Sequence, residues 1–79
     1  MLFEEVKQQE QSYLMPTYGR FQVALVSGKG ATAVDTEGKP YIDFGAGIGV
    51  NALGYCDPDW VEAVCGQAAA LQHISNLYY

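Results

Sequence analysis

The 79-residue sequence predicts an α+β fold, and three features along the chain support this class. An amphipathic helical stretch comes first and is followed by short β-forming runs that alternate with turn residues. A second helical stretch follows a glycine-rich segment. We therefore expect an N-terminal helix, a three-stranded antiparallel meander, a glycine-rich loop and a second helix, in that order.

The first helix is expected within residues 2–14. Apolar side chains form a thin stripe there, among glutamate, glutamine and lysine residues that favour helices. Pro16 follows shortly after, and it should end the helix because proline has no backbone N–H to donate.

The meander is expected between residues 21 and 44, where short runs rich in β-forming residues alternate with turn residues. Glycine in the turn segments supplies the positive φ that tight turns require. Consecutive runs joined by such short turns predict antiparallel pairing. The expected strands are 23–26, 31–34 and 41–44, and the expected turns are 28–30 and 35–39.

The glycine-rich segment, residues 45–54, contains the pattern G-x-G-x-x-A of dinucleotide-binding loops. That pattern binds a pyrophosphate only if a helix begins within it, whereas Gly54 and Pro58 delay the next helix. Close approach of a ligand or another chain to the main chain is the better interpretation, with Ile48 and Val50 as an apolar wall. A flexible connector between sheet and helix is the alternative.

The second helix is expected from about Pro58 to about Gln72. Asp57 is a good N-cap, Pro58 suits the first helical position, and Asp59 places negative charge at the positive end of the helix dipole. Apolar residues then recur on one face at helical spacing. They are Trp60, Val64, Ala68 and Leu71.

Charge and targeting signals argue against several partners. The net charge is -5 and the basic residues are scattered, so no positive stripe can follow a phosphate backbone. These residues are Lys7, Arg20, Lys29 and Lys39. The N-terminus is acidic where a signal peptide is basic, and no apolar stretch reaches the length of a membrane span. We expect a cytoplasmic protein without nucleic-acid or membrane partners.

The cysteines and the histidine predict neither a metal site nor a catalytic centre. Cys56 and Cys65 match no redox or zinc spacing, and we expect free, partly buried thiols in a reducing compartment. No nucleophile with a nearby base can be assembled from local spacing, so no catalytic residue is expected in this chain.

The chain is expected to be a fragment of a longer protein. Nearly half of its residues are apolar, yet a chain this short has no disulfide framework or metal cluster to stabilise a small core. Its last residues, 73–79, end on two tyrosines, as if an element were cut short. We expect the core to be completed by further sequence or by a second subunit.

Five strings of residues follow one another in an order that is more specific than any of them alone. They are 18–25, 28–30, 35–44, 46–54 and 73–79. This order resembles the N-terminal region of class III aminotransferases over residues 15–79. The opening Tyr-Gly-Arg-Phe and the closing Ser-Asn-Leu-Tyr-Tyr look most like the branch of that family that acts on N-acetylornithine. Two departures stand out: Tyr-Cys-Asp at 55–57 where the family typically has His-x-His, and Gln22 where proline is common.

The resemblance implies a fold type I enzyme that uses pyridoxal 5'-phosphate (PLP) and works as a homodimer. Residues 1–79 would be the N-terminal segment of its small domain, leading into the large domain. In the family a lysine binds PLP covalently and an acidic residue pairs with its ring nitrogen. Neither lies in the N-terminal part, so the 79 residues alone should bind no PLP tightly and catalyse nothing.

The resemblance also implies which residues of this chain form the site. Tyr18 and Ile48 match positions that line the pocket near the substrate side chain, and Gly47 lies beside Ile48, where a larger residue would intrude. A second group matches a segment near the dimer interface and the active-site entrance. This group is Ser75, Asn76 and Tyr78.

The expected reaction is transfer of an amino group between N-acetylornithine and 2-oxoglutarate, a step of arginine biosynthesis. Its partners would be a small amino acid, a 2-oxo acid and a second copy of the full-length chain. Two alternatives stay open. One is ornithine or 4-aminobutyrate as the amino donor on the same scaffold, and the other is a stand-alone interaction module without catalysis.

Overall fold

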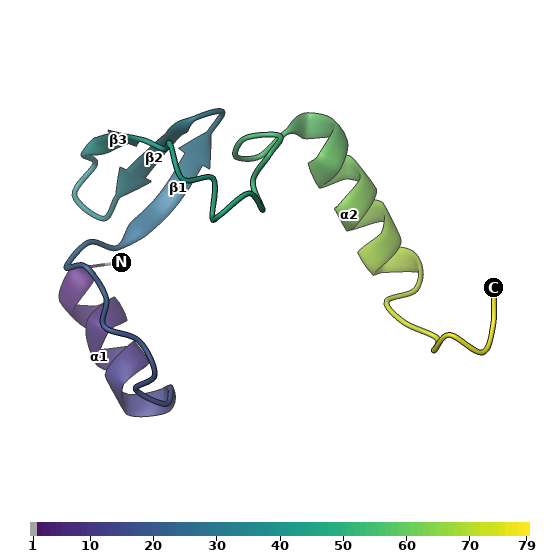
Figure 1. Cartoon of the computed structure of the whole chain (residues 1–79), viewed down its shortest axis with the longest axis horizontal. Helices are drawn as coiled ribbons and strands as arrows, with labels where there is room; N and C mark the ends of the chain where they lie inside the picture. Colours follow the sequence, from purple (N-terminus) through teal and green to yellow (C-terminus); the bar gives the residue numbers. More distant parts are fainter. Residues whose placement is uncertain (1) are drawn as a thin grey trace.

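The computed structural model describes residues 2–79 and confirms the α+β prediction (Figure 1). The sheet has the order β1-β2-β3, and both neighbouring pairs are antiparallel, which confirms the meander. A helix precedes the sheet and another follows it. The elements are α1 (Phe3–Tyr13), β1 (Leu25–Lys29), β2 (Thr32–Asp35), β3 (Pro40–Ile42) and α2 (Pro58–Ala70).

Helix α1 forms where the sequence predicts it. Its first turn is closed by the Glu5 carboxylate, which accepts a hydrogen bond from the Leu2 backbone N–H at 3.0 Å. The partly buried side chains recur at a spacing of three and four residues, which shows that one face is turned toward the rest of the chain. These side chains are Phe3, Val6, Lys7 and Glu10.

Strand β1 lies further along the chain than predicted, so the expected strand at 23–26 and the expected turn at 28–30 are wrong in position. Lys29 pairs with Thr32, which leaves Gly30 and Ala31 as a two-residue turn. Gly30 has a φ of 59°, a value that glycine adopts without strain.

Gly28 lies inside β1 because another residue occupies the space that its side chain would fill. A Cβ at Gly28 would lie 2.8 Å from Cγ of Tyr55, so the tyrosine ring rests directly on this strand. The Tyr55 backbone also pairs with Gly30, donating to its carbonyl at 2.8 Å and accepting from its N–H at 3.1 Å. The glycine reflects a contact between distant segments rather than a turn.

Strand β3 ends two residues earlier than predicted, because Asp43 leaves the ladder. Its Oδ1 accepts hydrogen bonds from the backbone N–H groups of Gly45 at 2.8 Å and Ala46 at 2.9 Å. The Asp43 side chain thereby starts the glycine-rich segment as a turn. The expected strand at 41–44 is wrong at its C-terminal end.

The glycine-rich segment runs as consecutive turns from the sheet to α2. Backbone hydrogen bonds join Ile48 to Gly45, Asn51 to Ala46 and Gly54 to Asn51, each at 2.9 Å. No helix begins within the segment, and the preceding strand belongs to an antiparallel sheet. The dinucleotide-binding interpretation therefore lacks the βαβ unit that it requires.

Helix α2 begins as predicted and ends earlier. Asp57 caps it by accepting a hydrogen bond from the Trp60 N–H at 3.1 Å, and Pro58 takes the first helical position. The helix ends at Ala70 rather than near Gln72, because Leu71 is extended.

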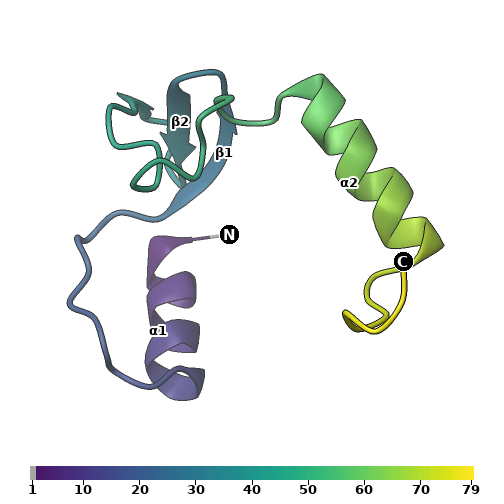
Figure 2. The same ribbon diagram turned by 45° about the vertical axis from the view of Figure 1, so that its right-hand side comes forward.

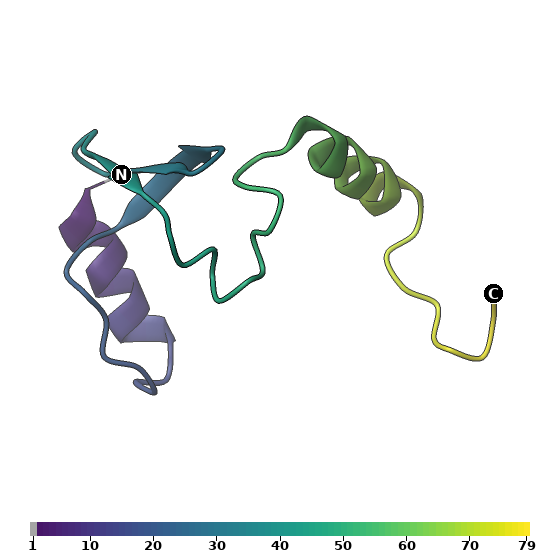
Figure 3. The ribbon, with the colours of Figure 1, turned by 45° about the horizontal axis from the view of Figure 1, so that its top comes forward.

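The described residues do not form a closed core. Helix α2 stands away from the sheet in all three views (Figures 1, 2 and 3). The radius of gyration is 16.1 Å, against about 12 Å for a compact chain of this length. The accessible surface is 7229 Å², against about 4,700 Å² for a compact protein of this mass. Ala33 is the one fully buried apolar residue among those described. The elements are arranged to pack against something else.

Replacing Gly28 with alanine is expected to destabilise the protein by about 1–3 kcal/mol, because the new Cβ would overlap the Tyr55 ring. Thermal unfolding of the full-length protein measures the effect. Gly19→Ala is the matched control, since nothing described lies within 4 Å of a Cβ placed there. Equal unfolding temperatures for the two variants would show that the Tyr55 ring does not pack on Gly28.

Candidate functional site

The predicted site residues come from three separate segments, and all of them are exposed. Tyr18 lies between α1 and β1, Gly47 and Ile48 lie in the glycine-rich segment, and residues 75–78 follow α2. Exposure is expected of a pocket wall whose opposite side is supplied by other sequence.

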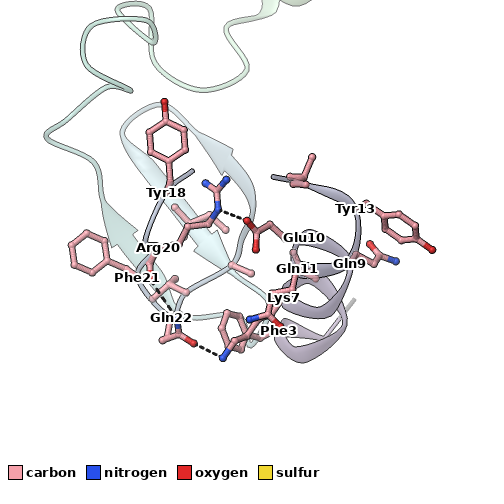
Figure 4. Close-up of a pocket in the computed structure, with 15 residues that line it drawn as sticks. Phe3, Lys7, Gln9, Glu10, Gln11, Tyr13, Tyr18, Arg20, Phe21 and Gln22 are labelled. Carbon is pink, nitrogen blue, oxygen red and sulfur yellow. Dashed lines mark hydrogen bonds and ion pairs between the residues drawn. The ribbon is translucent and has the colours of Figure 1, made fainter. Parts of the chain in front are cut away.

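A groove of about 710 Å³ lies between α1 and the segment 18–25 (Figure 4). Two polar contacts cross it. Arg20 Nε lies 3.3 Å from Glu10 Oε1, and Lys7 Nζ donates to Gln22 Oε1 at 2.9 Å. The Lys7 contact requires the amide oxygen of Gln22, which an apolar side chain could not supply. These contacts hold the segment carrying Tyr18 against α1.

Tyr18 borders this groove and a second one of about 660 Å³, which lies between its segment and the sheet. The Arg20 guanidinium lies 5.8 Å from the centroid of the Tyr18 ring, within range of a cation–π contact. Gly47 and Ile48 border neither groove. These two grooves therefore do not join Tyr18 to Ile48, and the shared role of the two residues stays a prediction.

Ile48 is fully exposed and has a φ of 63°. A β-branched residue in this left-handed region is strained, and such strain concentrates at functional sites. Gly47 has a φ of 59°, which makes any larger residue there unfavourable. The backbone thus presents the Ile48 side chain outward at an energetic cost.

The contact between Tyr55 and Asp43 is a feature that sequence reasoning missed. The Tyr55 hydroxyl donates to Asp43 Oδ2 at 2.6 Å, while Oδ1 of the same carboxylate caps the turn at Gly45 and Ala46. These hydrogen bonds, that from Tyr55 first, lower the pKa of Asp43 below its ordinary value of 3.8. The same contact raises the pKa of Tyr55 above 10.0. Tyrosine twelve residues after an aspartate carries no local signal of such a pair.

A second pair of the same kind lies within the sheet. Tyr41 donates to Asp35 Oδ2 at 3.0 Å, and Asp35 Oδ1 caps the turn by accepting from the N–H groups of Glu37 at 2.8 Å and Lys39 at 2.9 Å. The Lys39 N–H is the largest cause of the lowered pKa of Asp35, and the bond to Asp35 raises the pKa of Tyr41. This pair braces the β2–β3 turn.

The Tyr55–Asp43 bond is expected to be present between about pH 4 and pH 10. Asp43 favours the folded state above its ordinary pKa of 3.8, and this contribution is lost as the pH falls through its lowered folded value. Tyr55 favours the folded state below its ordinary pKa of 10.0, and this contribution is lost as the pH rises through the raised pKa that it has in the folded state. NMR titration of isotope-labelled tyrosine rings in the full-length protein should show that Tyr55 ionises above pH 10.0 in the wild type. In Asp43→Asn it should ionise at a lower pH than in the wild type. Identical titration in both proteins would contradict the pairing.

The segment after α2 carries the predicted entrance residues. Ser75 has a φ of 76°, and its Oγ accepts a hydrogen bond from the Leu77 N–H at 3.3 Å. Asn76 and Tyr78 are exposed beside this turn. The segment lies beyond α2, away from the sheet (Figure 1). Its role at an interface or entrance stays a prediction.

The three lysines of residues 2–79 lie apart from one another. Lys7 bonds to Gln22, and Lys29 and Lys39 are exposed at strand β1 and at the turn before β3. That the lysine binding PLP lies outside these residues stays a prediction.

Three further properties bear on the class of site. Cys56 and Cys65 are free, as expected, but exposed rather than partly buried. Residues 2–79 hold no group of three or more histidine, cysteine or acidic side chains that could bind a metal ion. None of the helices described is long and apolar enough to span a membrane.

Comparison with known proteins identifies the family. The class-III aminotransferase profile matches residues 13–79. Acetylornithine aminotransferase of Haemophilus ducreyi is 47% identical over 79 residues, which is 100% of this chain and 20% of that protein. The crystal structure of acetylornithine aminotransferase from Elizabethkingia anophelis superposes with a TM-score of 0.88 at 30% identity, covering 100% of this chain and 21% of that chain.

A third match bears on the cofactor. The ornithine aminotransferase from Toxoplasma gondii, solved with partial occupancy of PLP at its active site, superposes with a TM-score of 0.86 at 29% identity. It covers 99% of this chain and 18% of that chain. Both solved structures confirm that the helices and strands of this chain form one part of the aminotransferase fold.

The chain belongs to the class III aminotransferase family. It spans about a fifth of the length of the curated relatives that it matches.

Proposed function

We propose that this chain is the N-terminal segment, residues 1–79, of a PLP-dependent aminotransferase that transfers an amino group between N-acetylornithine and 2-oxoglutarate in arginine biosynthesis. The observation that carries the proposal is the 47% identity to an acetylornithine aminotransferase over the whole chain. The two solved structures do not separate the donors, since the acetylornithine and ornithine aminotransferases are 30% and 29% identical to this chain. The acetylated donor is favoured because curated relatives at 47–53% identity are named acetylornithine aminotransferases.

In the proposed enzyme this chain supplies structure around the substrate rather than the reacting groups. Tyr18, Gly47 and Ile48 form part of the wall near the donor side chain, and the segment 75–78 lies near the dimer interface and the active-site entrance. PLP, held by residues beyond this chain, supplies the electron sink. A cytoplasmic location fits the exposed free thiols of Cys56 and Cys65, which persist in a reducing compartment. The homodimer is proposed on the family resemblance alone.

The test is an assay of the full-length protein that contains this sequence. With 2-oxoglutarate as acceptor, we expect kcat/KM for N-acetylornithine to exceed that for ornithine and 4-aminobutyrate by at least about tenfold, the scale of one well-made pocket contact. A preference for either other donor would replace the proposed substrate by the alternative on the same scaffold. Absence of any transfer in a folded, PLP-loaded protein would remove the enzyme proposal.

The interaction-module alternative has one observation in its favour, the large exposed apolar surface. The chain exposes about 2,500 Å² more than a compact protein of its mass. The mass of the protein purified from its natural source separates the two. A product of 8.6 kDa in a complex would favour the module, whereas a product several times heavier would favour the enzyme.

A further inference from the structure

The glycine-rich segment is held at both of its ends by the sheet. At one end Asp43 follows β3 and caps the first turn through Oδ1. At the other end Tyr55 pairs with Gly30 through two backbone hydrogen bonds, and its ring covers Gly28. The hydroxyl of Tyr55 then reaches back to Asp43 Oδ2 at 2.6 Å. This hydrogen bond joins the two ends of the segment directly.

Between these ends the segment has little else to fix its shape. Its backbone turns are closed by single hydrogen bonds, and Ile48 and Val50 are almost entirely exposed. Ile48 nevertheless keeps a strained φ of 63°. Strained backbone persists only where the surrounding structure determines it, and here the closed ends are the described structure that does so.

The contact depends on the length of the side chain at position 55, which is a tyrosine. A tyrosine hydroxyl extends further from the backbone than either nitrogen of an imidazole, and it reaches Asp43 while the ring stays on Gly28. A histidine on the same backbone could not span both contacts.

We propose that Tyr55 is a positioning residue, which closes the glycine-rich segment by bonding to Asp43 and so fixes where Ile48 meets the amino donor. The inference rests on the proposed function, because it assigns Ile48 to the donor pocket. Tyr55 itself does not touch the substrate. It acts through the segment that it closes.

The test compares Tyr55→Phe with Tyr41→Phe in the full-length holoenzyme. Both variants remove one tyrosine hydroxyl from an aspartate that caps a turn, but Tyr41 braces the β2–β3 turn and not the segment bearing Ile48. Tyr55→Phe keeps the ring on Gly28, so the fold is retained. We expect the amides of Ile48 and Asn51 to exchange with solvent about tenfold faster in Tyr55→Phe and unchanged in Tyr41→Phe.

The second readout is donor preference, which a purely structural brace would not change. The ratio of kcat/KM for the two best amino donors should shift by about three- to tenfold in Tyr55→Phe and stay constant in Tyr41→Phe. Equal exchange in the two variants overturns the closure. Faster exchange with an unchanged ratio overturns the positioning role. If N-acetylornithine is not a donor, the proposed function fails, yet exchange and the ratio for the donors actually used still decide the role of Tyr55.

Discussion

The 79-residue chain, prepared without further sequence, is expected to have no transaminase activity and to form no covalent lysine adduct of PLP in defined stoichiometry. The family resemblance assigns both the lysine that binds PLP and the acidic residue at its ring nitrogen to later sequence. Lys29 and Lys39 are exposed, where an ammonium group is fully hydrated and a poor nucleophile. The measurement is the absorbance of lysine-bound PLP after mixing, followed by reduction and mass analysis.

The control for this prediction is the full-length protein under the same conditions, which should show one bound PLP per chain. Scattered low-level modification of surface lysines by excess PLP is no contradiction, since it would not saturate at one site. A single saturating adduct on Lys7, Lys29 or Lys39 would show that the covalent anchor lies within this chain.

The exposed apolar surface gives a physical reason to expect that these 79 residues need further sequence to function. Folding normally offsets the loss of chain entropy by burying apolar area, and among residues 2–79 Ala33 alone is a buried apolar residue. The residues left exposed include Phe21, Phe44, Ile48 and Leu77. Sequence outside this chain, or a second copy of the full protein, must cover part of this surface for the elements to hold their places.

The elements with local signals were predictable from sequence. Helix α2 starts at Pro58 because Asp57 accepts from the Trp60 N–H, and both residues lie together in the sequence. The antiparallel order of the sheet follows from short connections, which are equally local. The predicted C-terminal end of α2 was less accurate, because no glycine or proline shortly after Ala70 marks where the helix stops.

The strand positions were not predictable, because distant residues set them. Gly28 is a turn former by composition, but the Tyr55 ring takes the space of its side chain and keeps it in β1. Asp43 looks like part of a strand, but its carboxylate bonds to the next turn and to Tyr55. The position of Gly28 depends on a tyrosine that is distant in sequence, whereas the end of β3 depends on a local turn at Gly45 and Ala46, which the Tyr55 hydroxyl reinforces.

The candidate site was predicted by family resemblance and not by physical reasoning from the residues. The strained φ of Ile48 agrees with a functional position, but no periodicity or spacing signals it. Neither of the two grooves that Tyr18 borders includes Ile48. A pocket whose other walls come from further sequence cannot be derived from residues 1–79 alone.

Replacing Ile48 with tyrosine in the full-length enzyme is expected to change the discrimination between N-acetylornithine and ornithine by about 1–3 kcal/mol, the scale of a single pocket contact. The substitution adds bulk and a hydroxyl to an apolar wall. It should not strain the backbone further, because a β-branched residue is already the less favourable choice at a φ of 63°.

The comparison needs kcat/KM for both donors and the unfolding temperature of each protein. Leu53→Tyr is the matched control, because Leu53 is an exposed apolar residue of the same segment that is not assigned to the pocket. We expect the donor ratio to change in Ile48→Tyr, to stay constant in Leu53→Tyr, and both proteins to unfold near the wild-type temperature. An unchanged ratio together with a lower unfolding temperature in Ile48→Tyr would mean that Ile48 packs the small domain and does not face the donor.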